Sequence, residues 1–394
     1  MRSTRLTHQN HVLNRRSVCS GPFRRLSFRA EAVLAKAREA YKARDYRWVA
    51  ELVNTRGVRR SFILAIIVAV IITTGTARAG ELGHYNPGVY NIRDFVIPEP
   101  GFYGLLYNYF YTSDKLNDKN GNKIDTVTIR RGEATLKTTM DIDIYALVPV
   151  FMWSSPCEFL GARYTAYISP SFATSSLGAS LNASNGRGIS REIDSSFGVG
   201  DLFVQPVWLD WSLKHFDFAL AYGFYAPVGR YNLETVSFPV IGPRTVEAAD
   251  NIGLGFWTHQ FQWALVWYPW ENKGTAFVAA LTYEVNQKKE GFDITPGSHL
   301  TLNWGISQYL PITRDKLLLA EIGPTGYSQW KMTGDIGTDT INGDVLDQVH
   351  AVGGQVGLTY LPWKASLNLH YYYEFASEAR FQGQALNVSL AVKF

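Results

Sequence analysis

The last nine residues of the chain, 386–394, alternate apolar with small or polar side chains without a break. Leu386 and Leu390 project to one face of an extended segment, and Asn387 and Ser389 project to the other. A strand that separates lipid from a wet interior needs one apolar and one polar face. The pattern therefore predicts a membrane-spanning β-strand at the carboxy terminus.

The same alternation recurs in twelve segments of roughly the 9–11 residues that a tilted membrane strand needs. They lie near 102–112, 139–152, 161–170, 199–210, 215–226, 252–268, 275–286, 298–309, 316–330, 348–361, 365–376 and 382–394. The connections at 113–138, 171–198, 227–251, 287–297 and 331–347 are long, and those at 153–160, 211–214, 269–274, 310–315 and 362–364 are short. Long loops on one side and short turns on the other are typical of an outer-membrane barrel. We therefore expect an all-β fold, an antiparallel transmembrane β-barrel of about twelve strands at 102–394, with both termini on the short-turn, periplasmic side.

A soluble β-sandwich also alternates apolar and polar residues, so it is the main alternative fold. It explains neither the aromatic terminal residue Phe394 nor the alternation of long and short connections. Phe394 resembles the signal that marks bacterial barrels for insertion. This resemblance implies outer-membrane lipid and the barrel-insertion machinery as partners.

A secretory signal peptide is predicted at 56–79, ahead of the strands. Three arginines precede an apolar run at 62–72, which is shorter than the roughly 20 residues that a spanning helix needs. Ala77 and Ala79 form a small-x-small cleavage site. Cleavage there leaves a mature chain that begins at Gly80 and is exported to the outer membrane of a Gram-negative bacterium.

Residues 1–55 form a basic leader upstream of this export signal. Within it, residues 30–54 combine helix formers with a helical apolar spacing, which alone would indicate a basic amphipathic helix. No methionine occurs between Met1 and Met140, so a start at a non-AUG codon near Val58 would place the signal peptide first. We predict that the leader is absent from the working protein.

The charge of the chain is unevenly distributed. Residues 1–79 hold 16 of the 38 Lys and Arg but only 4 of the 34 Asp and Glu, which leaves 22 basic and 30 acidic residues. The formal net charge of +4 therefore conceals a mature protein near −8, without a basic stripe for nucleic acid. Because Cys157 is the one cysteine of the mature chain, no intramolecular disulfide is expected.

The polar faces of the strands are expected to line the barrel and a substrate path through it. In the second segment, Asp141 and Asp143 alternate with apolar residues, and acids at alternate positions need a wet side. The expected lining residues are Asp141, Asp143, Tyr145, Arg163, Tyr167, Asp201, Asp217, Tyr225, Glu284, Glu321, Tyr327, His370, Tyr372 and Glu374. With Arg163 as one of few inward cations, such an interior is net acidic and disfavours anions. The tyrosines offer stacking surfaces to an aromatic solute, although the same side chains could simply brace a narrow interior.

Residues 80–101 precede the first strand and contain three prolines, which prevent a regular strand or helix. This segment would either fold into the lumen as a plug or extend as a periplasmic tail. In the first alternative, the interior wall would hold His84, Arg93 and Asp94.

Several motifs carry a family resemblance. The start of the mature chain contains His84-Tyr-Asn-Pro-Gly88, Asn91-Ile-Arg-Asp-Phe95 and Pro98-Glu-Pro-Gly-Phe-Tyr103, and glycine-rich motifs follow at 161–164, 198–202, 225–229, 251–255 and 304–308. Over 84–394 the sequence resembles the outer-membrane family of phenol meta-pathway degradation proteins and transporters. The resemblance implies passage of hydrophobic or aromatic compounds across the outer membrane, often for catabolism.

Other chemistry is weakly indicated. Residues 117–122 have the composition of a calcium loop but lack the carboxylate that such a loop needs at its twelfth position, so a surface turn is expected. A lipid hydrolase would need a serine beside a histidine, and Ser298 and His299 point to opposite faces of a strand. We therefore predict no enzymatic activity, no metal site and no cofactor.

The sequence thus predicts a passive outer-membrane channel for small hydrophobic or aromatic compounds, which move down their gradient. A general porin and an adhesin or structural barrel are the alternatives. An outer-membrane lipid hydrolase is less favoured.

Overall fold

The computed structural model describes residues 81–394, apart from 130–133, 184–187, 239–241, 249 and 341. The predicted leader and signal peptide, with Ala77 and Ala79, lie outside the described residues. The described residues of 81–236 and 245–394 belong to one compact unit, which contains the barrel. Among the described residues, no helix is long and apolar enough to cross a membrane.

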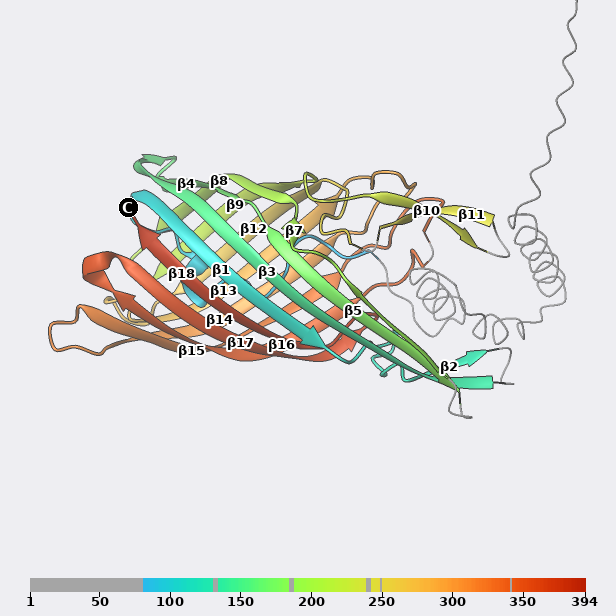
Figure 1. Cartoon of the computed structure of the whole chain (residues 1–394). Helices are drawn as coiled ribbons and strands as arrows, with labels where there is room; N and C mark the ends of the chain where they lie inside the picture. Colours follow the sequence, from blue (N-terminus) through green and yellow to red (C-terminus); the bar gives the residue numbers. More distant parts are fainter. Residues whose placement is uncertain (1–80, 130–133, 184–187, 239–241, 249, 341) are drawn as a thin grey trace, which may run out of the picture. The chain divides into compact units, whose positions relative to one another are not determined.

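Twelve antiparallel strands close into a barrel, as predicted (Figure 1). They are β1 (Gly101–Ser113), β3 (Ala134–Phe159), β4 (Ala162–Ser169), β8 (Leu202–Ser212), β9 (Phe216–Ala226), β12 (Thr258–Trp267), β13 (Thr275–Asn286), β14 (His299–Pro311), β15 (Leu318–Lys331), β16 (Gln348–Tyr360), β17 (Ala365–Glu378) and β18 (Gln384–Lys393). Strand β1 closes the circle because it pairs with both β3 and β18. The 3₁₀ turn η2 (Leu361–Trp363) forms the short connection between β16 and β17.

Some strands continue beyond the barrel wall, where the sequence predicted loops. Additional elements are β2 (Thr126–Ile129), β5 (Phe172–Ala183), β6 (Gly188–Asp194) and β7 (Gly198–Val199), with β10 (Leu233–Phe238) and β11 (Gly242–Glu247) as a separate two-stranded sheet. Strand β5 pairs with the outer half of β3, and β6 pairs with β5. Strand β3 has 26 residues, more than twice the roughly 9–11 that a membrane crossing needs, so its outer half is free to pair in this way.

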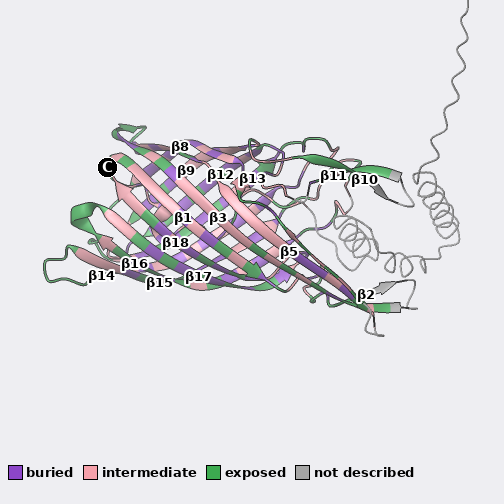
Figure 2. Ribbon diagram, viewed as in Figure 1, coloured by how far each residue is buried: buried purple, intermediate pink, exposed green. Residues whose placement is uncertain are grey.

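Side chains alternate between the two faces of the wall, which appears as alternating buried and exposed positions along each strand in Figure 2. On β12, Gln260 is 1% exposed and Leu265 is 49% exposed. Directly paired residues point to the same face, so the register assigns the inner row of every strand. In β18, the inner row contains Asn387 and the outer row Leu386, as predicted.

The register of β3 reverses one expectation. Tyr107 of β1 is buried inside the barrel and pairs with Val148 of β3, so the apolar row of β3 is the inner one. Asp141, Asp143 and Tyr145 therefore lie on the outer face, and the prediction that they line the interior is wrong. Alternation distinguishes two faces of a strand without saying which one is inside. The side chains of Asp141 and Asp143 are exposed and lie toward the long-loop end of β3. They can therefore be hydrated without pointing into the lumen.

Residues 81–100, called the luminal segment below, run inside the barrel along its length. At the long-loop end, the backbone N–H of Glu81 donates to Asp335, beyond the end of β15. At the short-turn end, the carbonyl of Pro98 accepts from Ser154 of β3. The expectation that the mature chain starts on the short-turn side is therefore wrong for Glu81, because the chain crosses the lumen before β1 begins.

Candidate functional site in the barrel lumen

The carboxylate of Asp201, just before β8, connects the luminal segment to two loops at the long-loop end. It accepts hydrogen bonds from the backbone N–H groups of Gly229 and Leu254 at 2.9 and 2.8 Å. Nε2 of His84 lies 2.9 Å from the same carboxylate. Four motifs that carry the family resemblance, at 84–88, 198–202, 225–229 and 251–255, therefore meet at one buried acid.

This junction also explains two of the glycines in these motifs. A Cβ atom added at Gly229 or at Gly253 would lie 2.8 Å from Oδ1 of Asp201. The loops can approach the carboxylate only because both positions lack a side chain.

His84 is held on two further sides. Its Nδ1 lies 2.7 Å from Oγ1 of Thr258, and its ring stacks on Tyr225 with the centroids 4.7 Å apart. The residue thus contacts inner residues of β9 and β12 in addition to Asp201.

The backbone of Tyr85 is bonded on both sides to inner residues of the wall. Its N–H donates to Glu284 at 2.7 Å, and its carbonyl accepts from Gln329 at 3.1 Å. Its hydroxyl accepts from Asn303 at 2.8 Å. These contacts tie the luminal segment to β13, β14 and β15.

The 3₁₀ turn η1 (Ile92–Phe95) lies nearer the short-turn end and is fixed by the carboxylate of Asp94. This carboxylate accepts a hydrogen bond from the backbone N–H of Asn91, the residue that caps η1, and another from the hydroxyl of Tyr107, both at 2.7 Å. The apolar side chains of η1 pack in a buried cluster with Val266 and other inner residues of β12 and β13.

Arg93 extends from η1 to the neighbouring part of the wall, at β14, β15 and the turn before β13. Its guanidinium donates to Ser307 at 2.7 Å and to the carbonyl of Gly274 at 2.9 Å, and it lies 3.6 Å from the carboxylate of Glu321. It also lies 4.1 Å above the ring centroid of Tyr309. One side chain thereby connects the segment to the wall through an ion pair, hydrogen bonds and a cation–π contact.

We expect Arg93→Met to lower the free energy of unfolding by about 3 kcal/mol, because it leaves the buried Glu321 carboxylate without its cation. Urea unfolding in lipid vesicles, followed by tryptophan fluorescence, measures the change. The double variant Arg93→Met with Glu321→Gln should recover part of the loss. Strictly additive effects would show that the two side chains are not coupled.

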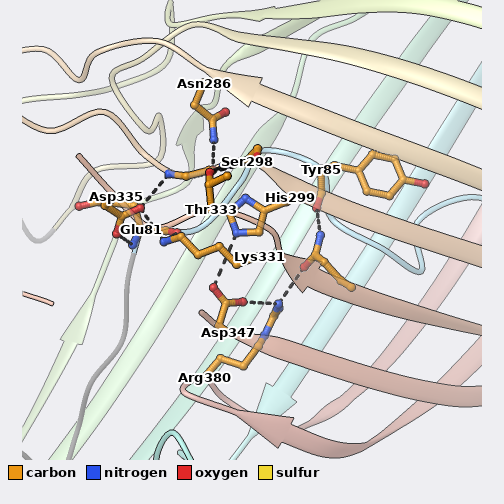
Figure 3. A network of polar contacts seen from close by, with 12 residues as sticks. Glu81, Tyr85, Asn286, Ser298, His299, Lys331, Thr333, Asp335, Asp347 and Arg380 are labelled. Carbon is orange, nitrogen blue, oxygen red and sulfur yellow. Dashed lines mark hydrogen bonds and ion pairs between the residues drawn. The ribbon is translucent and has the colours of Figure 1, made fainter. Parts of the chain in front are cut away.

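A network at the long-loop end holds the first described residues (Figure 3). The buried ammonium of Lys331 contacts Asp335 at 2.6 Å and donates to the carbonyl of Glu81 at 2.8 Å. The ammonium of Lys289 contacts the carboxylates of Glu81 and Glu247. Burial lowers the pKa of Lys289, but these two carboxylates outweigh burial and leave its pKa above the ordinary value.

A second part of this network surrounds Asp347, which follows the long loop before β16. Arg380 contacts Asp347 at 3.2 Å and Gln329 at 2.8 Å, and Nε2 of His299 lies 3.7 Å from Asp347. Since Gln329 also donates to the backbone of Tyr85, this group of side chains supports the luminal segment indirectly.

The interior is electrically more balanced than the sequence suggested. Arg93 faces Glu321, Lys273 lies 2.9 Å from Asp217, and Arg163 lies 2.9 Å from Asp210. Glu374 accepts from the hydroxyls of Tyr327 and Tyr111. Three of the inner acids thus have a cation beside them, from the luminal segment, from a turn and from β4, and the net acidic interior stays a prediction.

Except for Asp141, Asp143 and Tyr145 on β3, all the predicted lining residues lie on the inner side of the wall. They are Arg163, Tyr167, Asp201, Asp217, Tyr225, Glu284, Glu321, Tyr327, His370, Tyr372 and Glu374. Their role in a solute path stays a prediction.

Two inner residues escaped the sequence analysis because β8 contains a bulge. The register with β4 and β9 shifts around Pro206, which cannot donate a ladder hydrogen bond. Trp208 and Asp210 point inward as a result, although strict alternation from Asp201 would place them outside. A proline within an otherwise regular strand was the signal for this shift.

A cavity of about 270 Å³ lies between the luminal segment and the wall, toward the short-turn end. Its aromatic lining consists of Tyr90, Tyr103, Tyr107, Tyr167, Trp208 and Tyr309, with Phe95 from η1. Lys364, in the turn after β16, and Lys393, at the end of β18, also line it, so the cavity extends to the end of the barrel where the short turns lie.

The outer face holds a serine–histidine pair that the sequence did not indicate. Oγ of Ser328 lies 2.8 Å from Nδ1 of His350, its direct partner across β15 and β16. Ser298 and His299 do not pair, as expected, and Ser298 instead contacts Thr333 at 3.1 Å. Among the described residues, no group of three or more possible metal ligands occurs.

The closed barrel with its two-faced strands defines the class of the protein, an outer-membrane β-barrel. Residues 113–390 match the family described as MetA-pathway of phenol degradation, and the chain belongs to this family. The family resemblance inferred from the motifs is confirmed.

Several solved structures are similar to this chain, and one of them, with a TM-score above 0.5, shows the same fold. An outer membrane channel from Pseudomonas putida F1 is 15% identical, with a TM-score of 0.51 over 79% of this chain and 100% of that chain. The β domain of a Bordetella autotransporter is 11% identical, with a TM-score of 0.40 over 75% and 100% of the two chains. A FadL homologue from Pseudomonas aeruginosa is 12% identical, with a TM-score of 0.36 over 82% and 98%. No curated protein sequence matches the chain.

Proposed function

We propose that this protein is a passive channel that admits small hydrophobic or aromatic compounds through the outer membrane. The observation that carries the proposal is the cavity beside the luminal segment, whose lining includes seven aromatic side chains among polar and charged ones. Tyrosine and tryptophan side chains present apolar faces with a polar edge, which suits an aromatic solute better than a sugar. Membership of the phenol-degradation family supports the same solute class.

In the proposed mechanism, the luminal segment closes the resting channel and its displacement opens a path. A solute enters from the long-loop end, occupies the cavity and leaves at the short-turn end. Movement follows the concentration gradient and uses no cofactor. Arg93, Arg163 and Lys273 each face a carboxylate, so these three cations offer little attraction to free anions.

Two partner proposals follow from the same picture. The outer rows of apolar residues would contact outer-membrane lipid. The barrel-insertion machinery would read Phe394, whose side chain is 81% exposed.

The test is solute entry into vesicles whose outer leaflet carries lipopolysaccharide, with and without refolded 80–394. Such a leaflet slows apolar solutes, which would otherwise cross a plain bilayer unaided. We expect alkylbenzenes and phenols to enter several-fold faster with the protein, and sugars of similar size to gain little. Equal acceleration of sugars would indicate a general porin, and no acceleration would favour an adhesin or structural barrel.

A lipid hydrolase is the second candidate, and the contact between Ser328 and His350 on the outer face is the observation that favours it. The serine would attack a lipid ester while the histidine accepts its proton. Within the described part of the chain, no carboxylate or amide bonds the second ring nitrogen of His350, so an orienting third group is missing. Release of fatty acid from vesicle phospholipid that Ser328→Ala abolishes would support this candidate.

A further inference from the structure

Gln205 of β8 stands out among the residues that line the cavity. Its side chain is 1% exposed, yet neither its amide nitrogen nor its amide oxygen has a hydrogen-bond partner. A buried amide without partners costs free energy, so its retention calls for a physical explanation. A molecule in the cavity could supply both missing hydrogen bonds.

The surroundings of Gln205 define the shape of such a molecule. Tyr167 is its direct partner on β4, and the ring of Tyr167 lies in a tilted contact with Phe203 and edge-on to Trp208. Tyr90 of the luminal segment completes this wall, with its hydroxyl 3.4 Å from that of Tyr167. One unpartnered amide thus lies in the wall of the cavity, beside these aromatic rings.

The bulge at Pro206 is what produces this arrangement. It allows Gln205 and Trp208 to point inward from the same strand, three positions apart. Regular alternation would have placed one of the two on the outer face. The cavity therefore combines an amide and an indole that an unbroken strand would keep apart.

We propose that this cavity is a binding site for a single-ring aromatic compound with a hydroxyl substituent, and that Gln205 recognises the hydroxyl. The inference rests on the proposed channel function and adds the solute class. The ring packs against Tyr90, Tyr167 and Trp208. The hydroxyl donates to the Gln205 amide oxygen and accepts from its nitrogen, which provides partners for both atoms.

The size of the cavity agrees with one ring. About 270 Å³ lies just below the 300–1,000 Å³ typical of sites for drug-sized ligands. A dry cavity of about 150 Å³ suffices for benzene in another protein, so a substituted single ring fits here.

The probes for the test are 4-bromophenol and bromobenzene, which differ only in the hydroxyl. Binding to refolded 80–394 is measured by calorimetry in detergent, with empty micelles as the blank. Gln205→Leu should weaken 4-bromophenol about tenfold and leave bromobenzene nearly unchanged, because only the hydroxylated ring loses a hydrogen bond. Anomalous diffraction from bromine should place the ring beside Tyr167.

The matched control is Gln260→Leu. Gln260 of β12 is also inward, 1% exposed and without hydrogen-bond partners, but it does not line the cavity. Its substitution should leave the affinity for 4-bromophenol unchanged. Equal weakening by both substitutions, or equal affinity of the wild-type protein for both probes, overturns the proposal.

The vesicle assay separates this proposal from the channel proposal. If bromobenzene enters faster with the protein and Gln205→Leu binds 4-bromophenol normally, the binding site is wrong and the channel function stands. If 4-bromophenol binds through Gln205 but neither probe enters faster, the site stands and the channel function is wrong.

Discussion

Deletion of residues 81–98 is expected to raise the ion conductance of the refolded barrel several-fold. The segment runs along the lumen from Glu81 to the start of β1 and packs η1 against inner residues of β12 and β13. Side chains alone can fill an eight-stranded barrel, but a twelve-stranded barrel is wider. A chain segment inside the wider lumen therefore determines how much water the lumen holds. Single-channel recording in planar bilayers measures the change.

The control for this deletion removes residues 234–246, which carry most of β10 and β11 and contribute no strand to the barrel. That variant should keep the original conductance. A difference in gel migration between unheated and heated samples, which folded barrels show, establishes that both variants fold. An unchanged conductance after loss of 81–98 from a folded barrel would contradict the proposal that the segment closes the channel.

Substitution of Asp201 by alanine is expected to lower the free energy of unfolding by about 3 kcal/mol, because several buried donors lose one acceptor together. The donors are the backbone N–H groups of Gly229 and Leu254 and the ring of His84. Loss of the carboxylate should also release residues 81–90, the half of the luminal segment nearer the long-loop end. Urea unfolding in vesicles measures the stability, and hydrogen exchange of residues 81–90 measures the release.

Asp141→Ala is the matched control for Asp201→Ala. The sequence assigned both acids to the interior, but Asp141 lies exposed on the outer face of β3. Its loss should change the free energy of unfolding by less than about 0.5 kcal/mol. A large effect at Asp141 together with a small one at Asp201 would reverse the assignment of inner and outer rows.

The strands themselves were predictable from the sequence. All twelve expected segments overlap observed barrel strands, because a wall between lipid and an interior imposes alternation on each strand separately. The glycine-rich motifs were visible too, but their purpose was not. Only the fold shows that Gly229 and Gly253 make room for the Asp201 carboxylate.

The sequence by itself thus determined the barrel class, the strand positions and the family of this protein, since these depend on local patterns and motifs. The tertiary structure decided which row of β3 faces inward, which cations approach the interior acids, and how Gln205 and Trp208 come to share one cavity. It also decided that the chain before β1 returns through the lumen. Each of these depends on register, on a bulge or on contacts between residues far apart in the chain, and a period-two pattern carries no information about any of them.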